Sequence, residues 1–114
     1  MNLKALEERF LKEDIKTRMG HLASDLVKAA TFIEIGSSQQ AKSVMIEGKY
    51  FAEWSAAGLN VEDQGKMAEI QSYLALRELQ WSKWYETPNA LKSTVNDLRN
   101  WSQELLKRGG FLNE

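Results

Sequence analysis

The chain has 114 residues, enough for one domain with a single hydrophobic core. It contains no cysteine, which excludes disulfides, thiolate metal sites and cysteine nucleophiles. The formal net charge is −1, with basic residues interspersed among acidic ones, so the composition disfavours nucleic-acid binding. The N-terminal stretch is charged throughout and predicts neither a signal peptide nor a membrane span, and we expect a cytoplasmic protein with no membrane partner.

The pattern of apolar residues predicts an all-α fold. The sequence holds a single proline and several long segments with apolar residues three and four positions apart. Short connections between amphipathic helices favour antiparallel neighbours. We therefore predict one domain over residues 1–114, an up-and-down four-helix bundle with an additional N-terminal helical segment.

The N-terminal segment has an apolar stripe of its own. Leu3, Leu6 and Phe10 share one helix face, about 150° away from the stripe that begins at Ile15. Either the helix breaks near residues 12–14, or one long helix faces two partners. Residues 1–12 then form either a short helix folded over the bundle or a separate arm that packs on a second subunit.

The next two predicted helices cover about residues 12–35 and 38–57. The first carries a regular apolar stripe and ends at Gly36, and Ser37 with Gln40 fits a capping box before the second. Small residues dominate one face of the second helix. A neighbouring helix can therefore approach closely at Gly48 and Ala52.

The third predicted helix spans about residues 61–86, after Asn60 as N-cap. Its main apolar face predicts core positions, with Trp84 and Arg77 at the edge, and a lesser stripe lies on another face. The main face comprises Met67, Ile70, Leu74, Trp81 and Tyr85, and the lesser stripe comprises Ala68, Ala75 and Leu79.

The last predicted helix has Thr87 as N-cap, Pro88 at its first position and Arg108 near its end. Phe111 and Leu112 are expected to fold back onto the core after the Gly-Gly pair.

Arg77 cannot be buried without a partner. Three arrangements satisfy it: stacking on Trp81 or Tyr73, pairing with Glu47 or Glu53, or facing a pocket or interface that binds an anion or a protein. If the core takes the other aromatic residues, then Tyr50, Trp54 and Trp84 remain for an exposed aromatic patch of the kind found at protein interfaces.

The single histidine belongs to a polar stripe of Asp14, Arg18, His21 and Asp25. A nearby carboxylate could let His21 act as an acid or base, whereas an ordinary ladder of ion pairs is the structural alternative. No nucleotide-binding glycine pattern, nucleophile motif or set of metal ligands accompanies it. The sequence therefore predicts no cofactor and no metal, and favours a non-enzymatic protein.

Three segments resemble a group of small all-helical cyanobacterial proteins. TRMGHLASDLVKAATF, EGKYFAEWSA and WSQELLKRGGFL are similar to motifs that recur there in this order, R-x-G-H/Q-L-A-x-x-L, E-S-K-[FY]-F-I-E-W and W-S-x-x-[VL]-L-x-x-x-G-x-L. The chain departs at Gly48, where the group has Ser, and at Ala52, where it has Ile. The resemblance implies a helical bundle in a cyanobacterial cytoplasm and supplies no activity. The shared segments include Arg18, His21, Glu47, Lys49, Glu53 and Trp54.

The sequence favours a protein that acts through protein–protein contacts as a homodimer, because it has much apolar and aromatic surface and no reactive constellation. The alternative is a small-ligand or anion-binding protein, or a weak enzyme, with a pocket formed by His21, arginine and carboxylates. That alternative requires His21 to meet a carboxylate from another helix. The candidate binding or interface residues are Arg18, His21, Asp25, Glu53, Trp54, Arg77 and Trp84.

Overall fold

A computed structural model describes residues 2–111, which form helices joined by short connections and contain no strand. The all-α prediction is confirmed. The helices are α1 (Leu3–Leu11), α2 (Ile15–Glu34), α3 (Ser38–Ser55), α4 (Val61–Leu79), α5 (Trp81–Trp84) and α6 (Pro88–Arg108).

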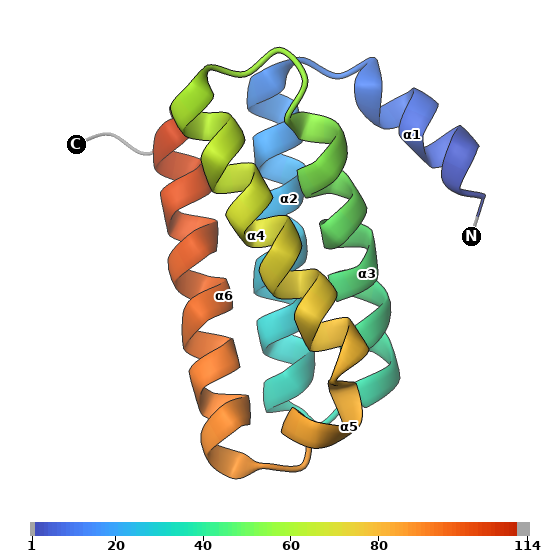
Figure 1. Cartoon of the computed structure of the whole chain (residues 1–114), viewed down its shortest axis with the longest axis vertical. Helices are drawn as coiled ribbons and strands as arrows, with labels where there is room; N and C mark the ends of the chain where they lie inside the picture. Colours follow the sequence, from blue (N-terminus) through green and yellow to red (C-terminus); the bar gives the residue numbers. More distant parts are fainter. Residues whose placement is uncertain (1, 112–114) are drawn as a thin grey trace.

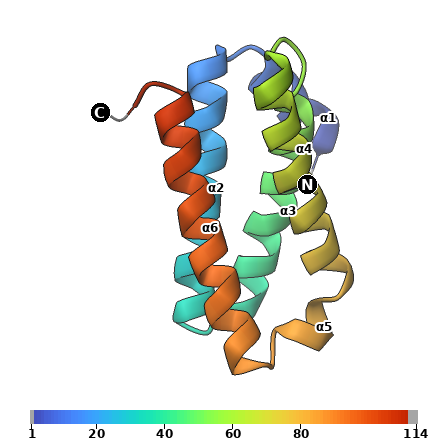
Figure 2. The ribbon, with the colours of Figure 1, turned by 60° about the vertical axis from the view of Figure 1, so that its left-hand side comes forward.

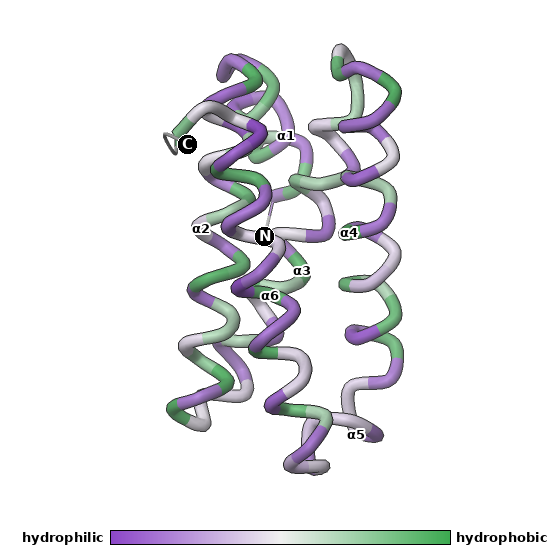
Figure 3. The backbone as a smooth tube through the Cα atoms, turned by 90° about the vertical axis from the view of Figure 1, so that its left-hand side faces the viewer, coloured by the Kyte–Doolittle hydropathy of each residue, from purple (hydrophilic) through white to green (hydrophobic). Residues whose placement is uncertain are grey.

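The four long helices α2, α3, α4 and α6 run beside one another, each antiparallel to the one before it (Figure 1). Helix α2 packs against both α3 and α6, and α3 packs against α4 on its other side (Figure 2). Apolar and polar segments alternate along each helix (Figure 3), as expected for helices that bury one face. The core is a continuous cluster centred on Leu22, Leu26, Met45, Met67, Ile70, Leu74 and Leu98.

Of the two alternatives for the N-terminal segment, a break near residues 12–14 and one long helix, the structure shows the break. Helix α1 ends at Leu11, and Asp14 caps α2 by accepting a hydrogen bond of 2.7 Å from the backbone N–H of Thr17. This bond lowers the pKa of the Asp14 carboxyl. Helix α2 thus begins three residues later than predicted, because the carboxylate at position 14 satisfies a free N–H of its first turn.

Helix α1 lies outside the long helices and packs against α3 of the same chain (Figure 1). Its contact residue is Phe10, which is 3% exposed and stacks on Phe51 with ring centroids 4.3 Å apart. Leu6 packs beside it, whereas Leu3 remains exposed. One aromatic stack therefore holds the N-terminal helix over α3.

Two other predicted caps have different outcomes. Asn60 caps α4 as predicted, with its side-chain oxygen accepting from the N–H of Asp63 at 2.8 Å. The predicted capping box at Ser37 and Gln40 is wrong, because Ser37 holds the N-cap position without a side-chain hydrogen bond. At the C-terminal end, Phe111 lies against Gly20 and Gly109, whereas Leu112 lies outside the described residues.

The predicted third helix is interrupted. Helix α4 ends at Leu79, and the separate single turn α5 follows after Gln80, whose backbone (φ −104°, ψ 25°) leaves the helical region. The predicted continuation to Glu86 is therefore wrong. The break changes which aromatic side chains face the core: Trp84 is buried at 4% exposure, while Trp81 and Tyr85 are half-buried.

Gly48 lies at the contact of α3 with α2 and α4, as the small-residue face predicts. A Cβ built there would lie 3.5 Å from the Leu74 Cδ1 atom and 3.6 Å from that of Leu22, which is ordinary contact. Glycine in a helix interior is less stable than alanine by about 0.5–1 kcal/mol. We therefore expect Gly48→Ala to raise the free energy of unfolding by about 0.5–1 kcal/mol in urea denaturation.

The matched control for this variant is Gly36→Ala. Gly36 has φ +78°, a left-handed conformation at the end of α2 that alanine adopts only with strain. This substitution should lower the free energy of unfolding by about 1 kcal/mol. Loss of stability in both variants would show that the space at Gly48 is too small for a methyl group.

Candidate functional site

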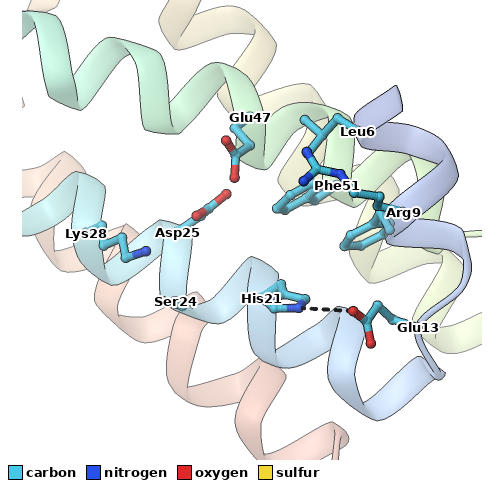
Figure 4. A pocket seen from close by; sticks show the side chains of 10 residues that line it. Leu6, Arg9, Glu13, His21, Ser24, Asp25, Lys28, Glu47 and Phe51 are labelled. Carbon is cyan, nitrogen blue, oxygen red and sulfur yellow. Dashed lines mark ion pairs between the residues drawn. The ribbon is translucent and has the colours of Figure 1, made fainter. Parts of the chain in front are cut away.

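A pocket of about 310 Å³ lies between α1, α2 and α3. Figure 4 shows that its side chains come from all three helices and from the connection between α1 and α2. Its wall combines the aromatic rings of two phenylalanines with charged side chains of both signs. The lining residues are Leu6, Arg9, Phe10, Glu13, His21, Ser24, Asp25, Lys28, Glu47 and Phe51.

Asp25 is the most buried charged residue of the pocket, with 6% exposure. Its carboxyl group points toward that of Glu47 on α3 (Figure 4). Burial, the negative charge of Glu47 and a hydrogen bond to it together raise the pKa of Asp25 to about 8, against a smaller lowering by Lys28. Asp25 Oδ2 is fully buried, and apart from the proton that the two carboxyl groups can share it has no hydrogen-bond partner among residues 2–111.

His21 lies at the rim of the same pocket. Its Nε2 atom is 4.0 Å from Glu13 Oε1, in the connection before α2, and both side chains are about half exposed. The rings of Phe10 and Phe51 are each 6.5 Å from the imidazole. The carboxylate beside His21 is thus that of Glu13, while Glu47 lines the same pocket opposite Asp25 (Figure 4).

Arg18 does not line the pocket. Its guanidinium donates to two backbone carbonyls, that of Leu11 at 2.7 Å and that of Glu13 at 2.9 Å. These are carbonyls at and just after the end of α1, where a helix leaves acceptors unsatisfied. Arg18 therefore fixes the turn between α1 and α2. The predicted ladder of Asp14, Arg18, His21 and Asp25 is divided among a helix cap, this turn and the pocket.

Arg77 lies between two aromatic rings. Its guanidinium carbon is 4.9 Å from the centroid of Tyr73 and 5.2 Å from that of Trp84. Of the three alternatives for Arg77, stacking is the one observed, on Tyr73 and on Trp84 in place of Trp81. The indole N–H of Trp84 also donates to the Arg77 carbonyl at 2.7 Å.

The predicted exposed aromatic patch is wrong for Trp84, which is buried because of the break at Gln80. Trp54 is half-buried and packs against Phe10, Phe51 and Tyr50. Glu53 is exposed and lines a shallow groove of about 220 Å³ between α3 and α4.

The outward face of α4 carries an apolar surface that the lesser stripe in the sequence indicated only in part. Positions three and four residues apart along the whole helix are exposed and uncharged, and we call this set the α4 outer face. It comprises Val61, Gly65, Ala68, Ser72, Leu76 and Leu79. Val61 and Leu79 are 85% and 82% exposed, and Leu76 is 53% exposed. Exposed aliphatic side chains gathered on one face of a helix are typical of an interaction site.

None of the helices within residues 2–111 combines the length and the apolarity that a membrane span requires. The same residues contain no group of three or more histidines and carboxylates that could hold a metal ion. Comparison with models of protein families, with curated proteins and with solved structures gives no match. The resemblance to cyanobacterial proteins therefore stays a prediction.

Proposed function

We propose that this protein is an up-and-down four-helix bundle with an N-terminal helical arm that acts through protein–protein contacts as a homodimer, joined along the α4 outer face. One observation carries the proposal. Three large aliphatic side chains, Val61, Leu76 and Leu79, stay exposed on one face of a helix whose opposite face supplies Met67, Ile70 and Leu74 to the core. Leaving this much apolar surface in water is unfavourable, and a partner surface would remove it.

A second copy of the chain fits this face because the face is self-complementary. A twofold axis midway between Ala68 and Ser72 makes two α4 helices antiparallel and sets Ala68 opposite Ser72 of the second copy. The same operation sets Val61 opposite Leu79, and Leu76 within one residue of Gly65. Aliphatic side chains thus meet at the two ends of about 27 Å of helix, small residues meet at the centre, and no Cβ at Gly65 obstructs the approach.

The residues that border the α4 outer face would allow two α4 helices to pack together. One border is formed by Gln64, Gln71 and Ala75, and the other by Glu69. Glu69 is already neutralised by Lys66, whose ammonium lies 3.3 Å away. An ion pair at an exposed edge contributes little affinity, so the aliphatic residues supply most of it.

Light scattering on the purified protein is expected to give about twice 13.0 kDa. Leu76→Lys should place an unpaired charge in the seam and weaken the dimer by roughly 30-fold or more, which corresponds to about 2 kcal/mol. Ile35→Lys is the matched control, because Ile35 is equally aliphatic, 66% exposed and outside the α4 outer face. A monomeric wild-type protein, or equal effects of the two lysines, contradicts the proposal.

Disulfide trapping tests the register. Since the chain has no cysteine, a single substitution supplies the only thiol. An oxidised mixture of the Ala68→Cys and Ser72→Cys proteins should form the mixed disulfide in preference, because the twofold axis sets these positions opposite each other. Ala57→Cys, in the connection after α3, is the control and should not form a dimer under the same conditions.

A further inference from the structure

We infer that the pocket between α1, α2 and α3 binds a small organic cation of the alkylammonium class. The ammonium group would lie between the carboxyl groups of Asp25 and Glu47, with the apolar body of the ligand against Phe51 and Phe10. This inference does not rest on the proposed dimer, because the pocket shares no residue with the α4 outer face.

The buried Asp25 carboxyl is the first observation that indicates a ligand. It is more than nine-tenths buried, it lines the pocket, and its Oδ2 atom has no N–H or O–H donor within residues 2–111 other than a proton shared with Glu47. A buried acceptor without a donor is destabilising, and native structures rarely keep one. An ammonium carries three N–H donors and a positive charge, so one such group satisfies both this oxygen and the neighbouring carboxylate.

The packing of α2 against α3 brings the two carboxyl groups together. Gly48 follows Glu47 on α3, and a Cβ built there would lie only 3.8 Å from the Cβ of Asp25. The close packing of the two helices here lets two acidic side chains from different helices share one site (Figure 4). Like charges this close repel each other unless a proton or a cation is shared between them.

The charged side chains around the pocket favour a ligand that carries a single positive charge. Lys28 and His21 face the pocket from α2, Arg9 from α1, and Glu13 from the connection between them. Lys28 is exposed and only partly offsets the effect of burial and of Glu47 on Asp25. An anion would meet the two carboxyl groups, whereas a second ammonium would meet Arg9 or Lys28, so a monoamine fits best.

The remaining properties of the pocket agree with a small amine. Two carboxyl groups are fewer ligands than a divalent metal ion takes in proteins, and the described residues offer no larger set. A volume of about 310 Å³ is at the lower end for ligand pockets and suits a body of a few carbon atoms. The stacked rings of Phe10 and Phe51 provide an apolar wall for that body.

The inference is tested by titrating isotope-labelled protein with n-butylammonium chloride and following amide shifts by NMR. We expect saturable shifts at residues of α2 and α3 around the pocket. Butan-1-ol, which has the same body without the charge, and butyrate, which has the opposite charge, should bind at least 10-fold more weakly. Binding of n-butylammonium should tighten from pH 6 to pH 8, because the ligand competes with the proton that the carboxyl pair holds.

Variants separate the carboxyl pair from the rim. Asp25→Asn and Glu47→Gln should each weaken n-butylammonium binding at least 10-fold, whereas Glu13→Gln, an exposed rim carboxylate, should change it less than 3-fold. Thermal melts establish that each variant is folded. Failure of n-butylammonium to saturate, stronger binding of butyrate, or equal affinity of the Asp25→Asn protein overturns the inference. None of these results affects the proposed dimer, which is measured by mass.

Discussion

Trp84→Ala is expected to lower the free energy of unfolding by about 3–5 kcal/mol, the range for removal of a buried tryptophan. Trp84 is the anchor of the turn after α4. Its ring packs edge-on against Trp81 and Tyr85, and the guanidinium of Arg77 lies over it. Its indole N–H satisfies a backbone carbonyl near the end of α4. Removal leaves a cavity and an unpaired acceptor, and urea denaturation at a fixed protein concentration measures the loss.

Trp81→Ala is the matched comparison, because Trp81 is the same residue type in the same turn but only half-buried. It stacks on Tyr85 with ring centroids 4.9 Å apart and should lose about 1–2 kcal/mol. A larger loss of stability for Trp81→Ala than for Trp84→Ala would contradict this account. It would support the continuous third helix that the sequence predicts, with Trp81 in the core and Trp84 at its edge.

The sequence predicts those features that depend on neighbouring residues. The phase difference between the stripes at Leu6 and Ile15 correctly indicates that the two segments face different neighbours, because 3.6 residues per turn fixes which side chains share a face, and a break was one of the two alternatives that it left. Asn60 is recognised as a cap because its side chain needs only an N–H three residues away. Pro88 at the first position of α6 follows the same local rule.

The break at Gln80 could not be predicted from local signals. Neither glycine nor proline occurs there, and the residues on both sides are good helix formers. The reason lies in tertiary structure: Trp84 gains a buried position and a bond to the Arg77 carbonyl only if the helix ends before it. The free energy gained by burying the Trp84 side chain thus exceeds the free energy lost by interrupting the helix at Gln80.

The proximity of Asp25 and Glu47 could not be predicted from the sequence either, because it depends on how far α2 and α3 are shifted along each other. The sequence named Asp25 as part of a polar stripe and Glu47 as a possible partner of Arg77, and gave no reason to join them. Their meeting is fixed by the contact of α2 with α3 at Gly48. The only signal in the sequence was Gly48 next to Glu47 on the small-residue face of α3. It indicates that another helix approaches closely there, but not which residues of that helix lie at the contact.

The stability of the protein is expected to depend on pH through Asp25. The folded-state pKa of about 8 is above the ordinary value of 3.8, so the folded protein holds this proton more tightly than the unfolded chain. This contribution to stability is fully present below about pH 4. It is lost as the pH rises to about 8, and it then becomes constant. The free energy of unfolding should therefore decrease between pH 5 and pH 9, apart from the contributions of other groups.

Asp25→Asn should remove this decrease and stabilise the protein by about 1–4 kcal/mol at pH 9, because a neutral amide replaces a buried charge that lies beside the carboxylate of Glu47. Urea denaturation at pH 5, 7 and 9 measures the effect, with Glu13→Gln as the control for an exposed carboxylate of the same pocket.

Glu47→Gln should shift the pH range in which the free energy of unfolding decreases to lower pH, since it removes the like charge beside Asp25. Parallel pH profiles of the wild type and Asp25→Asn would mean that Asp25 already carries its charge in the folded protein. Its carboxylate would then be stabilised by a cationic group of the protein, which would contradict the inferred binding of a ligand cation between Asp25 and Glu47.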